Sequence, residues 1–356
     1  MVGAAYADGR LLFGSGGALF SQAFDLDRLA IAGDRVRLAD SATQDSRAGH
    51  LAAHASNTGV LVFRVTSRSG DQFRILDRSG RHVRDVGSPD TYDNFDVSPD
   101  KRQIIAARRN ASGSTQYSLW LIDVVRGVTS LVSDRDDAAD SNDPAWAPDG
   151  QHIAFMHAGK VVMRLANGGD ERTLVDQEGY PDSFTRDGRF LTYGVARGNF
   201  YETWAIDLAT PGAKPIGLVT GISHVDEGRF SPNGKWLAYH SNQTGRAEVY
   251  AIPFPPTGER WQISQSGGVQ PRWSDRGDEL FFLNLEGRLL AAKTPDSDPR
   301  RAAAPEPLFM TGVAPSDSLD QFAPIGDQFL VRAPVTGGGD TPTVQVLVNW
   351  KASAPR

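Results

Sequence analysis

The chain has 356 residues, 40% of them hydrophobic, with 37 glycines, 21 prolines and no cysteine. The formal net charge of −6 argues against a surface for nucleic-acid phosphates, and the lack of cysteine excludes disulfides, thiolate metal sites and a cysteine nucleophile. No run of about 18 apolar residues occurs, so we expect neither a transmembrane helix nor membrane contact by this segment.

Short strands separated by turn residues are expected from the start of the chain. The N-terminal region offers four of them, at residues 3–7, 10–14, 18–24 and 35–39. Further on, a turn signature of Ser, Ala or Thr, then Pro, Asp and Gly recurs before apolar runs, with the clearest copies at Val97–Asp100, Trp146–Gly150, Phe184–Gly188, Phe230–Gly234 and Trp273–Gly277. Pro presets φ, Asp bonds to its own backbone and Gly adopts a positive φ, so each copy predicts a hairpin turn.

The signature recurs with a regular period. Weaker copies bring the starts to eight, at residues 6, 56, 98, 147, 185, 231, 274 and 323. Their mean spacing is about 45 residues, which is the length of a four-stranded propeller blade. Third strands are expected at residues 118–123, 202–207 and 248–252, fourth strands at 128–132 and 260–264, and C-terminal strands at 321–323, 328–332 and 344–350.

The sequence therefore predicts an all-β fold, a β-propeller of four-stranded antiparallel blades with minimal helix content. Eight blades are the preferred count, and seven result if the terminal units merge. Residues 1–352 are expected to form a single propeller domain, followed by a frayed tail at residues 353–356. The two ends of the chain must pair with neighbouring blades, because an open ring leaves sheet edges exposed. The strand tryptophans are expected to pack between blades.

The repeat resembles the TolB-type propeller repeat, a relative of WD repeats. A closer resemblance covers most of the chain and is to the C-terminal sensor propeller of bacterial membrane-attached serine/threonine kinases of the acidobacterial type. It is carried by Gly9–Phe13, Gln22–Asp25, Asp77–Gly80, Ser241–Tyr250, Trp261–Ser264, Gly267–Trp273 and Val346–Trp350. This resemblance implies the sensor part of a longer signalling protein and an extracytoplasmic (periplasmic) location. A cytoplasmic location is expected if Met1 is the native start.

Polar residues precede the turn signature by four residues in four repeats, and by three residues in the two repeats where the fourth position is apolar. Such residues lie where loops enter the innermost strand of each blade, and loops commonly carry function. We expect a ring at the channel mouth formed by Asn94, Asp143, Asp182, Glu227, Gln270 and Asp320, with Arg229 and Arg272 able to pair with it and His224 able to contact a ligand. The functional interpretation is a site for a polar ligand or a cation. The default interpretation is turn chemistry and solvated loops.

The other possible metal ligands, an acidic cluster and the histidines, do not form a recognisable metal site, and we expect no metal or cofactor. An acidic cluster could attract Ca²⁺, but it lacks the EF-hand spacing and terminal Glu, so a solvated loop is favoured over a site at Asp134, Asp136, Asp137, Asp140 and Asp143. The seven histidines form no His-Glu-x-x-His motif or close zinc pair.

No catalytic motif is present, neither Gly-x-Ser-x-Gly nor the kinase motifs. The sequence therefore favours a non-catalytic binding or sensor propeller, expected to be a monomer, for a protein, peptide or small ligand. The alternative is a propeller enzyme acting on a carbohydrate or lactone through channel carboxylates, with an optional metal. It predicts a channel carboxylate with a strongly raised pKa. A third hypothesis is a pure assembly module with a broad apolar patch.

Overall fold

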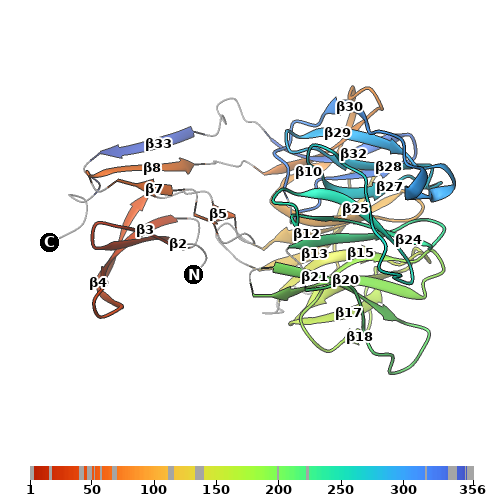
Figure 1. Cartoon of the computed structure of the whole chain (residues 1–356), viewed down its shortest axis with the longest axis horizontal. Helices are drawn as coiled ribbons and strands as arrows, with labels where there is room; N and C mark the ends of the chain where they lie inside the picture. The colour runs from red at the N-terminus through yellow and green to blue at the C-terminus, as the bar shows by residue number, and fades with distance from the viewer. Residues whose placement is uncertain are drawn as a thin grey trace. The chain divides into compact units, whose positions relative to one another are not determined.

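The computed structural model describes most of the chain. The described residues are 4–15, 18–39, 44–45, 50–51, 53–56, 58–65, 70–110, 116–132, 140–198, 200–221, 224–316, 319–335, 343–348 and 350. Regular structure in them is β except for two 3-10 turns, η1 (Pro295–Ser297) and η2 (Pro299–Arg301) (Figure 1). None of the described helical segments has the length and apolar character needed to cross a membrane. The predicted all-β class is confirmed.

The internal contacts divide the chain into two compact units. We call Gly70–Asn110 with Gln116–Pro334 the ring unit. The terminal unit takes in the described residues of Met1–Ser69 and Val335–Arg356. Each unit is described separately below.

Five sheets of the ring unit follow one another along the chain, each with four antiparallel strands in sequence order. The first two are β11 (Tyr92–Val97), β12 (Gln103–Arg109), β13 (Tyr117–Asp123) and β14 (Thr129–Leu131), then β15 (Ser141–Trp146), β16 (His152–His157), β17 (Lys160–Leu165) and β18 (Arg172–Val175). The next two are β19 (Tyr180–Phe184), β20 (Phe190–Arg197), β21 (Phe200–Asp207) and β22 (Ile216–Val219), then β23 (Val225–Phe230), β24 (Trp236–Ser241), β25 (Glu248–Pro253) and β26 (Trp261–Gln262). The fifth is β27 (Val269–Trp273), β28 (Glu279–Leu283), β29 (Arg288–Lys293) and β30 (Glu306–Met310).

The sixth sheet of the ring unit joins its two ends. It has the order β10-β9-β32-β31, built from β9 (Asp71–Leu76), β10 (His82–Asp90), β31 (Phe322–Ile325) and β32 (Gln328–Pro334). Strand β32 pairs antiparallel with β9, with Leu330 opposite Ile75. The innermost strands β31, β11, β15, β19, β23 and β27 contact one another in this circular order, and β27 contacts β31. The six sheets are therefore the blades of a closed ring.

The terminal unit contains the remaining sheets. One is four-stranded, with β1 (Ala4–Ala7), β2 (Arg10–Ser15), β3 (Ala18–Asp25) and β4 (Ala30–Ala39). The other two are a three-stranded sheet of β33 (Thr343–Val348), β8 (Val60–Val65) and β7 (Ala53–Ala55), and a two-stranded sheet of β5 (Gln44–Asp45) and β6 (His50–Leu51). Its core contains the buried side chains of Leu12, Leu19, Leu61, Phe63 and Trp350.

The propeller of four-stranded antiparallel blades is confirmed, and the eight repeat starts correspond to eight sheets of three or four strands. Six of these sheets close the ring, and two belong to the terminal unit. The single domain expected over residues 1–352 is thus divided. The physical reason is that β32 pairs with β9, which satisfies the edges of the ring before the terminal strands are reached.

The repeated turn explains why each blade begins as it does. The Asp149 carboxylate accepts hydrogen bonds from the backbone N–H groups of Gln151 (2.8 Å) and His152 (2.9 Å). Gly150 adopts a φ of 66° and donates to the Ala147 carbonyl at 3.0 Å. This turn joins antiparallel β15 and β16, as predicted for the first and second strands of a blade.

Neighbouring blades pack through apolar faces. Trp236 and Val249 on one blade share a buried cluster with Trp273, Leu280 and Phe282 on the next. Fully burying a large apolar side chain contributes about 1.5–3 kcal/mol. The expected inter-blade packing of tryptophan is confirmed at these positions.

Gly287 provides a stability test of the ring. It has a φ of 84° in the turn between β28 and β29, and an added Cβ would overlap the backbone oxygen of Val313. Gly287→Ala is expected to lower the free energy of unfolding by about 3 kcal/mol, through strain and overpacking. Gly150→Ala is the control, because its φ is also positive but its Cβ would meet open space. Urea denaturation should show the larger loss at Gly287, and equal losses would contradict a steric cause.

Candidate functional site

Five of the six innermost strands of the ring unit carry bulges at equivalent positions. Register shifts occur in β11, β15, β19, β23 and β27 where the predicted polar residues stand. Asp143, Glu227 and Gln270 have positive φ values of 50°, 57° and 59°. This backbone region is uncommon for residues other than glycine, and bulges re-aim side chains. Local backbone strain of this kind clusters at functional sites, so the bulges mark the channel as the candidate site.

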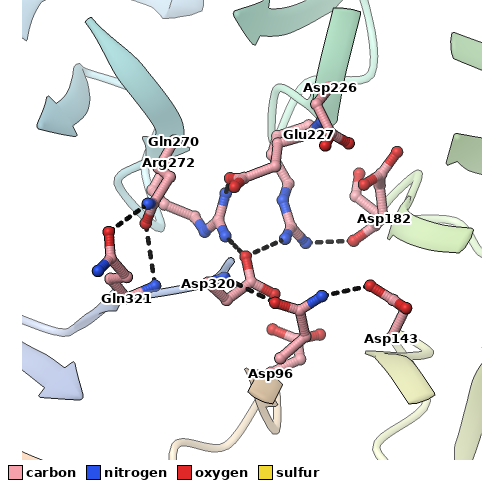
Figure 2. Close-up of polar contacts among 12 residues, drawn as sticks. Asp96, Asp143, Asp182, Asp226, Glu227, Gln270, Arg272, Asp320 and Gln321 are labelled. Atoms are coloured by element: carbon pink, nitrogen blue, oxygen red, sulfur yellow. Dashed lines mark hydrogen bonds and ion pairs between the residues drawn. The ribbon is translucent and has the colours of Figure 1, made fainter. Parts of the chain in front are cut away.

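Two arginines, the buried Arg272 and the mostly buried Arg229, organise the channel (Figure 2). Arg272 donates to Glu227 Oε2 at 2.8 Å and also to Asp320 Oδ1. Arg229 donates to the same Asp320 oxygen at 3.0 Å and to the Asp182 carbonyl oxygen. One carboxylate therefore serves two guanidinium groups, and four innermost strands or their entry loops are tied together.

The other side of the channel is held by amide groups. Asn94 donates to Asp143 Oδ1, and the Asn94 side-chain oxygen accepts from the Asp320 backbone N–H at 2.8 Å. Gln270 donates to Gln321 Oε1 at 2.8 Å and accepts from the Gln321 backbone N–H at 2.9 Å. These bonds fix the side chains around the ring before any ligand arrives.

The structure brings most of the predicted residues into one hydrogen-bonded and ion-paired neighbourhood: Asn94, Asp143, Asp182, Glu227, Arg229, Gln270, Arg272 and Asp320. His224 lies beside this group, with its Nε2 atom 3.8 Å from Asp226 Oδ2. In the predicted acidic cluster, Asp134, Asp136 and Asp137 lie outside the described residues. Asp140 instead accepts a hydrogen bond from the Tyr117 backbone N–H at 2.7 Å. Within the described ranges, no three His, Asp or Glu side chains form a group able to hold a metal.

Three members of the site, Asp96, Asp226 and Gln321, were not predicted. Asp96 accepts from the Trp146 backbone N–H at 2.8 Å, and it stands two residues before its turn signature, as Arg229 and Arg272 do. The repeat could therefore have indicated it. Gln321 directly follows Asp320, and only the pairing of its amide with Gln270 distinguishes it.

The channel holds more acid than base. Carboxyl groups come from Asp96, Asp143, Asp182, Asp226, Glu227 and Asp320, and the guanidinium groups from Arg229 and Arg272. The buried atoms Asp182 Oδ2 and Glu227 Oε1 have no hydrogen-bond partner in the described residues. Two acceptor oxygens of the channel are thus buried without a hydrogen-bond partner among the described residues.

Burial in the channel changes the pKa values of the carboxyl groups. Burial raises the pKa of Asp182 well above its ordinary value, and the neighbouring Asp226 adds to the effect. Burial also raises the pKa of Glu227 to about 8, against the attraction of Arg272. Burial alone would lower the pKa of Arg229, but Asp320, Asp182 and Asp96 raise it. A positive group placed among these residues would satisfy the open oxygens and favour their ionised forms.

The fold is that of a TolB-like β-propeller. A protein assigned as TolB in Agrobacterium tumefaciens has a similar structure, with a TM-score of 0.59, 18% identity, and coverage of 75% of this chain and 99% of that one. TolB from Acinetobacter baumannii has a TM-score of 0.53 and 15% identity, with 85% and 78% covered. These likenesses concern the fold, and they confirm the TolB-type part of the resemblance.

Sequence comparisons reach less far. No protein-family model matches the chain. Uncharacterized protein Atu1656 of Agrobacterium fabrum (strain C58) is 26% identical over 158 residues, which covers 41% of this chain and 52% of that protein. The match thus spans about half the length of this curated relative.

Proposed function

We propose that the ring unit is a non-catalytic binding propeller for a protein, peptide or small ligand. The ligand is recognised by a positively charged group of its own, which binds at the channel mouth of the propeller. The observation that carries the proposal is the pair of open, buried acceptors, Asp182 Oδ2 and Glu227 Oε1. They stand in a ring whose carboxyl groups outnumber Arg229 and Arg272. In this proposal, the site residues expected from the sequence line the channel mouth and bind the ligand.

The energetics favour a cationic ligand. A buried acceptor without a partner costs about 1–3 kcal/mol, and a donor brought by a ligand would recover that cost. Hydrogen bonds between charged groups are about twice as strong as neutral ones. Because Arg272 and Asn94 already hold the surrounding side chains, little ordering is needed on binding.

A random peptide library on phage, panned against the whole chain, tests the proposal. We expect the enriched peptides to contain Lys or Arg, and the matching synthetic peptides to bind about tenfold more weakly to Glu227→Gln. Glu286→Gln, at an exposed carboxyl group, is the control. Enriched peptides without basic residues, or equal binding to Glu227→Gln, would overturn the proposal.

A second candidate function is a hydrolase or lyase acting on a carbohydrate or lactone. The raised pKa of Glu227, about 8, is what a general acid at neutral pH would need. The bond from Arg272 to Glu227, however, suits a structural carboxylate held in place. Aryl glycosides and lactones distinguish the two. Turnover that Glu227→Gln abolishes would support the enzyme, and a binding propeller gives none.

The setting of the chain belongs to the same proposal. The TolB-like fold is compatible with a binding role outside the cytoplasm, and the resemblance to kinase sensor propellers suggests a signalling parent protein. We propose that this segment is a monomer and that it is the ligand-binding part of such a parent protein.

A further inference from the structure

An aromatic cluster lies beside the channel, between the sheet β19–β22 and the sheet β23–β26. The rings of Tyr180 and Tyr201 lie 5.6 Å apart between centroids, at 59° to each other. The ring of His224 meets Tyr201 edge-on, with centroids 5.3 Å apart and an angle of 74°. All three side chains are partly buried.

Carboxyl groups border the same cluster. Asp226 Oδ2 lies 3.8 Å from His224 Nε2, and both side chains are mostly buried. Figure 2 shows the Asp182 carboxyl group on the side of Asp226, while its carbonyl oxygen accepts from Arg229. The Asp182 Oδ2 atom, in a residue only 7% exposed, has no hydrogen-bond partner in the described residues, and its carboxyl group points to the side of the channel where Asp226 lies.

Gly194 lies next to Tyr180 and Asp226. It lies on β20, where an added Cβ would come 3.8 Å from Asp226 Oδ1 and 3.9 Å from Tyr180 Cβ. These are ordinary contact distances, and Gly194 is not among the glycines with a positive φ. A larger side chain there would lie between Tyr180 and the Asp226 carboxylate without straining the backbone.

We infer that Tyr180, Tyr201, His224, Asp182 and Asp226 form a subsite for a primary alkylammonium group, such as the side chain of a lysine residue. The aromatic faces attract a cation, and the carboxyl oxygens accept from its N–H donors. The compact ammonium fits acceptors that come from separate strands, whereas a guanidinium favours a planar, bidentate carboxylate. This inference rests on the proposed function and names the ligand group that it would receive.

The test uses NMR titration with N-acetyl-lysine methylamide as the probe. N-acetyl-norleucine methylamide, which is neutral, and N-acetyl-arginine methylamide, which is cationic, are the comparisons. We expect the lysine derivative to bind most tightly, and its affinity to fall about tenfold or more in Gly194→Val and in Tyr201→Leu. Tyr201→Phe should keep most of the affinity because it retains the aromatic face. Tyr117→Leu is the matched control. Tyr117 begins β13, as Tyr201 stands near the start of β21, and the guanidinium group of Arg109 already lies over the Tyr117 ring.

The outcomes separate this inference from the proposed function. If library peptides lose affinity for Glu227→Gln but bind Gly194→Val as well as the unaltered chain, the subsite is wrong and the binding propeller stands. Equal binding of the lysine and norleucine derivatives, or preference for arginine, also overturns the subsite. If no basic peptide binds the chain at all, both proposals fail. Folding of each variant is checked by its urea denaturation midpoint.

Discussion

Replacing Arg272 with methionine is expected to lower the free energy of unfolding by about 3–5 kcal/mol, because it leaves buried carboxylates without their partner. Arg272 is 8% exposed and pairs with both Glu227 and Asp320. Methionine has similar bulk, so the loss reports the missing charge and donors more than a cavity. Urea denaturation followed by tryptophan fluorescence measures it.

The matched control is Arg276→Met. The Arg276 side chain is 81% exposed and pairs with Asp278 at 3.4 Å, so we expect a change of less than about 0.5 kcal/mol. A comparable loss in both variants would contradict the argument that burial makes the channel arginine important. A small loss at Arg272 would show that the channel carboxyl groups take up protons at little cost.

Stability is expected to fall as pH rises from about 5 to about 8, and Glu227→Gln should make this dependence weaker. The pKa of Glu227 is raised from 4.5 to about 8 by burial, so in this window the folded state holds a proton that the unfolded state has released. The stabilisation is complete below the unfolded pKa and is lost as pH approaches the folded pKa. One such proton changes the free energy of unfolding by at most about 1.4 kcal/mol per pH unit.

Asp182 acts in the same direction, because burial raises its pKa too. The opposite slope comes from carboxylates such as Asp77 and Asp207, whose pKa values of about 2 place their effect at lower pH. The measurement is a series of urea titrations between pH 5 and pH 8.5, with Glu286→Gln as the exposed control. An unchanged slope in Glu227→Gln would contradict the assigned protonation.

Features that depend on neighbouring residues could be predicted from the sequence. The Pro148–Gly150 turn forms as predicted because its hydrogen bonds and its positive φ involve neighbouring residues only. The period of these turns predicted the blades, and a shared offset of four residues before the turn indicated Asn94, Asp143, Glu227 and Gln270, which the structure brings into one neighbourhood. The pattern succeeds because every blade repeats the same geometry.

The pairing of strands and of charged residues that are distant along the chain could not be predicted from the sequence. Either β32 or β33 could have met a strand from the N-terminal region, and only the three-dimensional structure assigns β32 to β9 and β33 to β8. The division into a ring unit and a terminal unit follows from that choice. Equally, no spacing indicates that Arg229 and Arg272 share Asp320, because the partners are separated by 91 and 48 residues along the chain.

By itself, then, the sequence determined the repeated strand-and-turn unit and the polar positions that face the axis, because both depend on contacts within a few residues. The tertiary structure decided how many units close the ring, which oxygens remain open and where Tyr180, Tyr201 and His224 meet. Those features arise from contacts between blades, where burial and strand pairing act over residues that are distant in sequence.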